Sequence, residues 1–146
     1  MLETSHTRTR SIVVASFVLA ALSACSGMAG NTGGASLRLT GAQEVPPVST
    51  SAAGSGTIKV ADDGAVSGSI TTTGLSGTMA HIHAGAAGAN GPVIIPLTKS
   101  ADGVWSVPPG ARLTGDQLKA YRAGDLYVNV HSDMNKGGEI RTQLKP

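Results

Sequence analysis

The chain is poor in cysteine, in aromatic side chains and in charge. Cys25 is the only cysteine among 146 residues, which excludes an intrachain disulfide, so the fold must rest on its core alone. One tryptophan, two tyrosines and one phenylalanine make up the aromatic content, whereas glycine occurs 20 times. Many turns and few large side chains favour short strands in a sheet-rich domain.

The net charge is too small to attract a polyanion. The chain has 11 basic and 9 acidic residues. Without residues 1–24, which hold Arg8, Arg10 and Glu3, nine basic and eight acidic residues remain, a net charge near +1. This balance gives no electrostatic basis for binding nucleic acid or an anionic membrane patch.

The N-terminal segment has the pattern of a bacterial export signal. Arg8 and Arg10 precede an apolar run over residues 12–21, which is too short to span a bilayer comfortably and is followed by small residues. The sequence Leu-Ser-Ala-Cys at 22–25 resembles a lipobox, in which cleavage before Cys25 leaves that cysteine lipidated. The alternative is an ordinary secretory signal with an unmodified cysteine.

These features predict three parts of the chain. Residues 1–24 are the expected lipoprotein signal peptide, residues 25–35 a small, polar, flexible tether, and residues 36–146 the folded domain. Ser26, rather than aspartate, follows the lipidated cysteine, as in lipoproteins that Gram-negative bacteria pass to the outer membrane. We therefore expect an exported protein of the bacterial cell envelope, attached to the outer membrane through its lipid.

The most informative stretch is the His-Ile-His sequence at 81–83. Read as a strand, it places Met79, His81 and His83 on one face, because side chains alternate along a strand. The two histidines are about 7 Å apart along the backbone, since each residue advances about 3.3 Å. Both imidazoles can lean toward one point and form a chelate for a metal ion.

The third histidine of the domain comes about fifty residues later. Leu126, Val128 and Val130 alternate with Tyr127, Asn129 and His131, so His131 lies on the face opposite the aliphatic residues. If this strand lies beside the first, three histidines converge. The other expected strands cover residues 36–40, 56–61, 65–73, 92–97, 103–107 and 139–144.

One short helix is expected after Leu113. Thr114 can cap its N-terminus, and Gln117 completes a capping box three residues later. Gly124 suits the left-handed residue that ends a helix. Leu118 and Tyr121 share the face that can pack on a sheet.

Several of these stretches together resemble the CHRD domain, first noticed in chordin and common in secreted bacterial proteins. They cover residues 39–47, 81–85, 113–114, 124–132 and 135–141 in that order. The departures are Lys136, where the family often has proline, and Thr142, where it often has glycine. The resemblance implies an all-β fold, an immunoglobulin-like Greek-key β-sandwich with one short helix.

The candidate metal ligands are His81, His83 and His131. Three imidazoles suit Cu(II) or Zn(II). A methionine sulfur would favour copper, which makes Met79 and Met134 possible additional ligands. Asn129 and Glu139 could instead orient an imidazole ring.

Three functions remain open at this stage. The first is a membrane-tethered domain that binds one metal ion, copper in preference to zinc. The second is a non-catalytic interaction module with structural histidines. The third is a copper-only redox protein, because copper-zinc superoxide dismutase also presents a His-x-His strand and a further histidine to copper, an analogy of fold and spacing only. We expect no catalytic residues.

Overall fold

The computed structural model describes Met1 and residues 34–146, so the expected signal peptide, Cys25 and most of the tether lie outside the described residues. The described part is nearly all β, with one helix, as expected from the sequence. Among these residues, no helix combines the length and the apolar character that a membrane crossing requires. The elements in chain order are β1 (Ser36–Thr40), the 3-10 turn η1 (Gly41–Gln43), β2 (Ala53–Val60), β3 (Val66–Thr73), β4 (Gly77–Ala84), β5 (Val93–Pro96), β6 (Thr98–Ala101), β7 (Val104–Ser106), α1 (Gly115–Ala123), β8 (Leu126–Ser132) and β9 (Ile140–Leu144).

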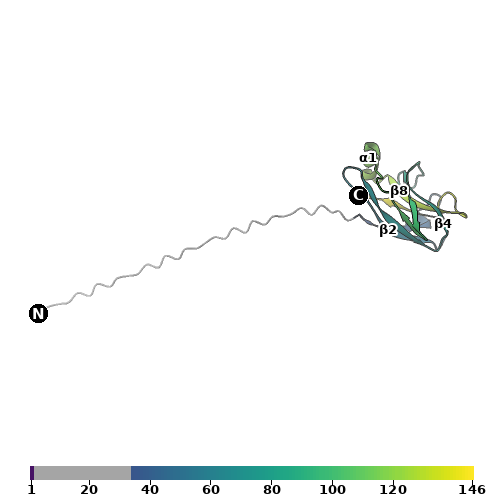
Figure 1. Cartoon of the computed structure of the whole chain (residues 1–146), viewed down its shortest axis with the longest axis horizontal. Coiled ribbons are helices and arrows are strands. Elements are labelled where there is room, and N and C mark those ends of the chain that lie inside the picture. The colour runs from purple at the N-terminus through teal and green to yellow at the C-terminus, as the bar shows by residue number, and fades with distance from the viewer. Residues whose placement is uncertain (2–33) are drawn as a thin grey trace.

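The strands form one antiparallel sheet that nearly closes on itself (Figure 1). Its order is β5-β4-β8-β9-β1-β2-β3-β7-β6. The two ends of this order, β5 and β6, are consecutive in the chain with only Leu97 between them. The chain therefore passes directly from one end of the sheet to the other, and the Leu97 N–H donates to the carbonyl of Ala80 at 2.9 Å.

The apolar faces of the curled sheet enclose one core. The alternate residues Ile82 in β4 and Val128 and Val130 in β8 are fully buried in it, as their strand pattern predicted. Trp105 of β7 also belongs to this core. A Cβ on Gly77 would meet both Trp105 and Val130, which shows how closely β7 packs across β4 and β8.

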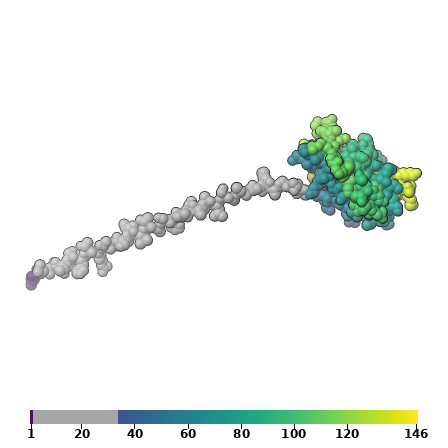
Figure 2. Space-filling model, in the orientation of Figure 1, coloured from purple at the N-terminus to yellow at the C-terminus, as the bar shows by residue number. Residues whose placement is uncertain are grey.

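The helix forms as its end signals predicted. The Thr114 side chain accepts from the Gln117 N–H at 3.3 Å, and the Gln117 side chain accepts from the Thr114 N–H at 2.8 Å. Gly124 ends the helix with φ of +82°, which glycine adopts without strain. Leu118 and Tyr121 pack against the core, and α1 stands at one end of the domain (Figure 2).

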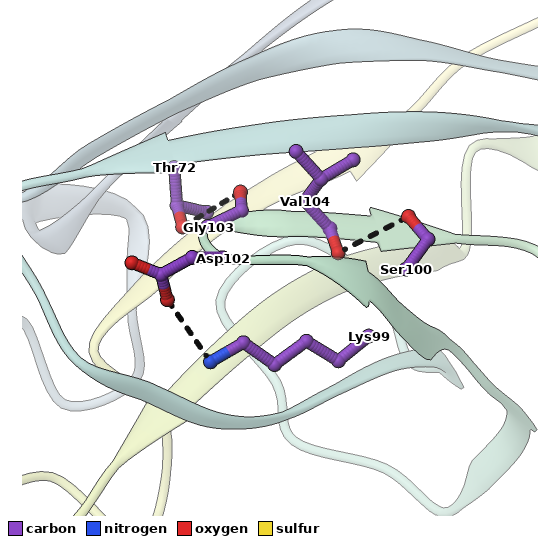
Figure 3. A network of polar contacts seen from close by, with 6 residues as sticks. All are labelled: Thr72, Lys99, Ser100, Asp102, Gly103 and Val104. Carbon is purple, nitrogen blue, oxygen red and sulfur yellow. Dashed lines mark hydrogen bonds and ion pairs between the residues drawn. The ribbon is translucent and has the colours of Figure 1, made fainter.

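Strand β6 was not expected from the sequence. All four of its residues are exposed, so no apolar alternation marks it. It forms because the β6–β7 hairpin is held locally: Lys99 pairs with Asp102 at 3.2 Å, and Ser100 Oγ donates to the Val104 carbonyl (Figure 3). Thr72 Oγ1 donates to the Gly103 carbonyl at 3.2 Å and ties this hairpin to β3.

Glu139 fastens the segment between η1 and β2 to the end of β8. Its carboxylate accepts from Thr50 Oγ1 at 2.8 Å and from Ser132 Oγ. Burial favours the neutral carboxyl, but hydrogen bonds from Ser132, Thr50 and Asn135 outweigh it and hold the pKa of Glu139 below its usual value. The ionised form therefore stabilises the fold.

We expect acid to remove this stabilisation. A lowered folded-state pKa contributes stability that is present above the unfolded pKa near 4.5 and is lost as the pH falls through the folded pKa. Wild-type protein should be more stable than Glu139→Gln at pH 7, and the difference should shrink below about pH 4.5. Urea midpoints across a pH series measure it. Exposed Asp133→Asn is the control, and a difference independent of pH would contradict the assignment.

Candidate metal centre

The pairing of β4 with β8 brings the three histidines together. The strands are antiparallel, with Met79 opposite His131, His81 opposite Asn129, and His83 opposite Tyr127. All of these side chains lie on the face of the sheet opposite the core. The predicted convergence of His81, His83 and His131 is therefore confirmed, and their role as ligands stays a prediction.

The three rings are in mutual contact. The centroid of His81 lies 5.5 Å from that of His83 and 4.9 Å from that of His131, and His83 and His131 are 6.2 Å apart. His81 Nδ1 and His131 Nε2 are separated by 3.0 Å. One ring nitrogen from each residue can be chosen so that all three lie within 4.8 Å of one another.

Two of the rings are oriented by backbone carbonyls. His83 Nδ1 lies 2.9 Å from the carbonyl oxygen of Gly91, and His131 Nδ1 lies 2.9 Å from that of Lys136. A carbonyl can only accept, so each Nδ1 carries the proton and each neutral ring presents the lone pair of Nε2. Metal-binding histidines are held in this way, with the second nitrogen donating to a carbonyl or carboxylate.

The remaining nitrogens fit a metal ion after a small adjustment. His83 Nε2 is buried and has no hydrogen-bond partner in the described part of the chain. His131 Nε2 accepts from His81 Nδ1, whose proton would move to Nε2 of that ring when a cation takes its place. Two nitrogens about 2.0–2.1 Å from one tetrahedral ion lie about 3.3 Å apart, so the pair at 3.0 Å must open slightly. The three nitrogens lie within 4.8 Å of one another, so a longer separation must shorten by rotation of the rings.

Burial favours the neutral form of His81 and His83. It lowers the pKa of both His81 and His83, and the neighbouring imidazoles lower the pKa of each further. For His83, hydrogen bonding to Gly91 and to the Asn129 side chain acts in the opposite direction without cancelling the effect of burial. Free lone pairs are thus available at neutral pH.

A buried arginine holds the loop that orients His83. Arg141 is 1% exposed and donates to the Ala89 carbonyl at 2.9 Å and to Asn90 Oδ1 at 3.1 Å. Its guanidinium carbon lies 3.3 Å from the ring centroid of Tyr127, which stacks on His83 at 4.6 Å. The Tyr127 hydroxyl accepts from the Gly91 N–H at 3.2 Å. Gly91 is therefore held through its N–H by Tyr127 and through its carbonyl by His83.

Gly91 lies where this loop passes closest to β4. A Cβ on Gly91 would collide with the carbonyl of Ala84. Glycine is therefore required where the loop passes close to β4 and presents its carbonyl to His83.

The other predicted site residues are distributed around the histidines. Met79 is 49% exposed beside His131, and Met134 is 92% exposed in the following turn. Asn129 is 2% exposed and interacts with His83. The Glu139 carboxylate is engaged by Thr50 and Ser132, while backbone carbonyls orient His83 and His131.

Glu44 is a further buried group that sequence reasoning missed. Its side chain is 4% exposed, and Oε1 has no hydrogen-bond partner in the described part of the chain. Burial raises its pKa, against the opposing effects of Arg141 and of a hydrogen bond from Asn129. Its place beside two prolines gave no indication of burial.

A large surface hollow lies elsewhere. It measures about 880 Å³ and is lined by residues near the end of α1 and the C-terminus, among them Arg122, Asp125 and Lys145. No histidine lines it. The candidate centre is therefore a cluster on the face of the sheet, covered by the loop at 85–91.

Comparison with known proteins assigns the chain to a family. The sequence profile of the CHRD domain matches residues 35–144, about three quarters of the chain. Neither a search of curated proteins nor one of solved structures finds a significant match. The match contains all three histidines of the candidate centre together with Glu44 and Arg141. The chain belongs to the CHRD domain family.

Proposed function

We propose that this domain binds one transition-metal ion through His81, His83 and His131. The observation that carries the proposal is the orientation of the rings: two Nδ1–H groups donate to backbone carbonyls, so both rings present the lone pair of Nε2 toward the cluster. On His83 this nitrogen has no partner among the described residues, and on His131 its partner is His81. A buried, unpartnered nitrogen on His83 is costly in a metal-free protein and would be satisfied by a cation. Neutral imidazoles suit both copper and zinc.

Copper is the metal that we favour. In the described part of the domain, the large apolar side chains with high exposure are Met79, Val93 and Met134. Two of these three are methionines, one opposite His131 and one in the turn after it. Thioethers are soft ligands that hold Cu(I), so they would give copper an advantage over zinc at the exposed side of the centre.

We further propose that the domain works outside the cytoplasm on a lipid anchor. The support is the signal pattern of residues 1–24 with the lipobox at Cys25. A tethered binding domain suits sequestration or delivery of a metal ion at the cell envelope. The residues of this chain would hold and orient the ion, and no residue is assigned to a chemical step.

One observation favours a purely structural role as the second candidate. His81 Nδ1 and His131 Nε2 already form a hydrogen bond at 3.0 Å, which satisfies one nitrogen of each ring without a metal. The histidines would then only join β4 to β8 in a protein interaction module. Direct metal binding experiments separate the two candidates.

Histidine variants should lose the metal. We expect wild-type protein to bind one equivalent of Zn(II) or Cu(II), and His81→Ala and His131→Ala each to weaken binding by more than about 100-fold, since loss of an outer hydrogen-bond partner alone costs about 10- to 100-fold. Titration calorimetry and elemental analysis measure this. Lys119→Ala, on the exposed face of α1, is the control. Wild-type affinity in both histidine variants would refute the site.

Metal removal should destabilise the domain. A ligand that binds only the folded state adds about 2.7 kcal/mol when its free concentration is 100 times Kd. Thermal melts with and without a chelator should therefore differ for wild-type protein and coincide for His131→Ala. A structural role for the histidines predicts instead that the chelator changes nothing in either protein.

The methionines should matter for Cu(I) alone. Met79→Leu and Met134→Leu remove a soft sulfur at nearly constant volume, so we expect weaker Cu(I) binding and unchanged Zn(II) binding. Competition with a chromophoric Cu(I) chelator measures the first and calorimetry the second. Val93→Leu, equally exposed on β5, is the matched control. Equal Cu(I) affinity in all four proteins would exclude the methionines.

A further inference from the structure

Three buried polar atoms near the histidines have no hydrogen-bond partner among the described residues. They are His83 Nε2, Asn129 Oδ1 and Glu44 Oε1. Buried polar atoms in folded proteins are nearly always paired, because an unpaired one loses its water without compensation. Asn129 lies between Glu44 and His83, and three unpaired atoms so close together indicate a binding site for a ligand.

Asn129 occupies the centre of the polar face. It lies in β8 between Tyr127 and His131, with His81 opposite on β4 and Arg141 opposite on β9. Its side chain is therefore surrounded by the proposed ligands and by the residues that hold them. Glu44 reaches it from the segment after η1.

Glu44 determines which end of the amide faces the histidines. An ionised Glu44 carboxylate can only accept, so the end of the Asn129 amide that can face it is the donor, Nδ2. A Cβ on Gly138 would collide with both Glu44 Oε1 and Asn129 Nδ2, so the two groups meet over the bare backbone of this glycine. With Nδ2 held by Glu44, the carbonyl oxygen Oδ1 is the end left for the histidines.

The oxygen of Asn129 shares this face of the sheet with a second acceptor. His83 donates its Nδ1 proton to Gly91 at 2.9 Å, so its Nε2 carries a lone pair in the neutral ring. Asn129 Oδ1 and His83 Nε2 are both buried and both lack a hydrogen-bond partner among the described residues. Two acceptors side by side repel each other unless a cation lies between them.

We propose that Asn129 Oδ1 is a fourth donor to the ion held by His81, His83 and His131, and that Glu44 is a positioning residue that orients the amide. This inference rests on the proposed function. An amide oxygen is a harder donor than imidazole and suits a divalent ion. Four protein donors also leave no open position on a tetrahedral ion, as in sites that hold a metal rather than use it for catalysis.

Variants of Asn129 test the oxygen donor. Asn129→Leu should weaken Zn(II) binding by about 10- to 100-fold and change the parallel g and hyperfine values of bound Cu(II) in electron paramagnetic resonance. Asn129→Asp keeps an oxygen donor and should retain Zn(II) affinity within about tenfold of wild type. Thr142→Val, which removes a hydrogen bond from β9 to Gln43 of η1, is the control. Thermal melts of the metal-free proteins confirm folding.

Variants of Glu44 test the positioning role. Glu44→Gln keeps an acceptor for Asn129 and should keep the wild-type Cu(II) spectrum, whereas Glu44→Leu releases the amide and should give the spectrum of Asn129→Leu. A wild-type spectrum in Glu44→Leu would overturn this role.

The outcomes for the two proposals are distinct. If Asn129→Leu binds Zn(II) and Cu(II) as wild type does, while His81→Ala and His131→Ala do not, the fourth donor is refuted and the three-histidine site stands. If wild-type protein binds neither ion, both proposals fail.

Discussion

The antiparallel pairing of β4 with β8 is the constraint on which the candidate centre depends. Its register sets Met79 opposite His131 and His83 opposite Tyr127, so three imidazoles from segments fifty residues apart meet on one face. A shift by one residue would turn His131 toward the core and Val130 outward, because side chains alternate along a strand. The fully buried aliphatic residues Ile82, Val128 and Val130 oppose such a shift. The packing of the apolar face therefore fixes the geometry of the polar one.

The outer face of the sheet is largely buried as well where it is formed by β8 and β9. The loop at 85–91 and the segment after η1 cover it, and Arg141 and Glu44 lie beneath them. Arg141 satisfies its guanidinium with carbonyls of the loop and stacks on Tyr127. A buried cation needs such partners. The same hydrogen bonds hold the loop in the position where the Gly91 carbonyl accepts from His83 Nδ1. The same contacts therefore stabilise the loop and orient His83.

Much of the fold could be predicted because its signals are local. The Thr114 capping box, the left-handed Gly124 and the turn at Gly64, with φ of +85°, are each fixed by a few neighbouring residues. Strand β6 could not be predicted, since its four exposed residues carry no alternation and its pairing depends on β7. Glu44 and Arg141 were missed as site residues for a similar reason: their charge predicts exposure, and only distant segments of the chain bury them.

The sequence by itself determined the alternation that places His81 and His83 on one face and His131 on the polar face of its own strand. It also determined membership in the CHRD family, because the order of the motifs is a property of the chain. Only the tertiary structure decided that β4 and β8 are neighbours, that the Gly91 and Lys136 carbonyls turn two imidazoles toward one point, and that Glu44 and Asn129 meet beside Gly138. These contacts join residues that are far apart in the chain, and no periodic pattern in the sequence indicates that they will meet. They form only when packing of the shared core brings the strands and their covering loops together.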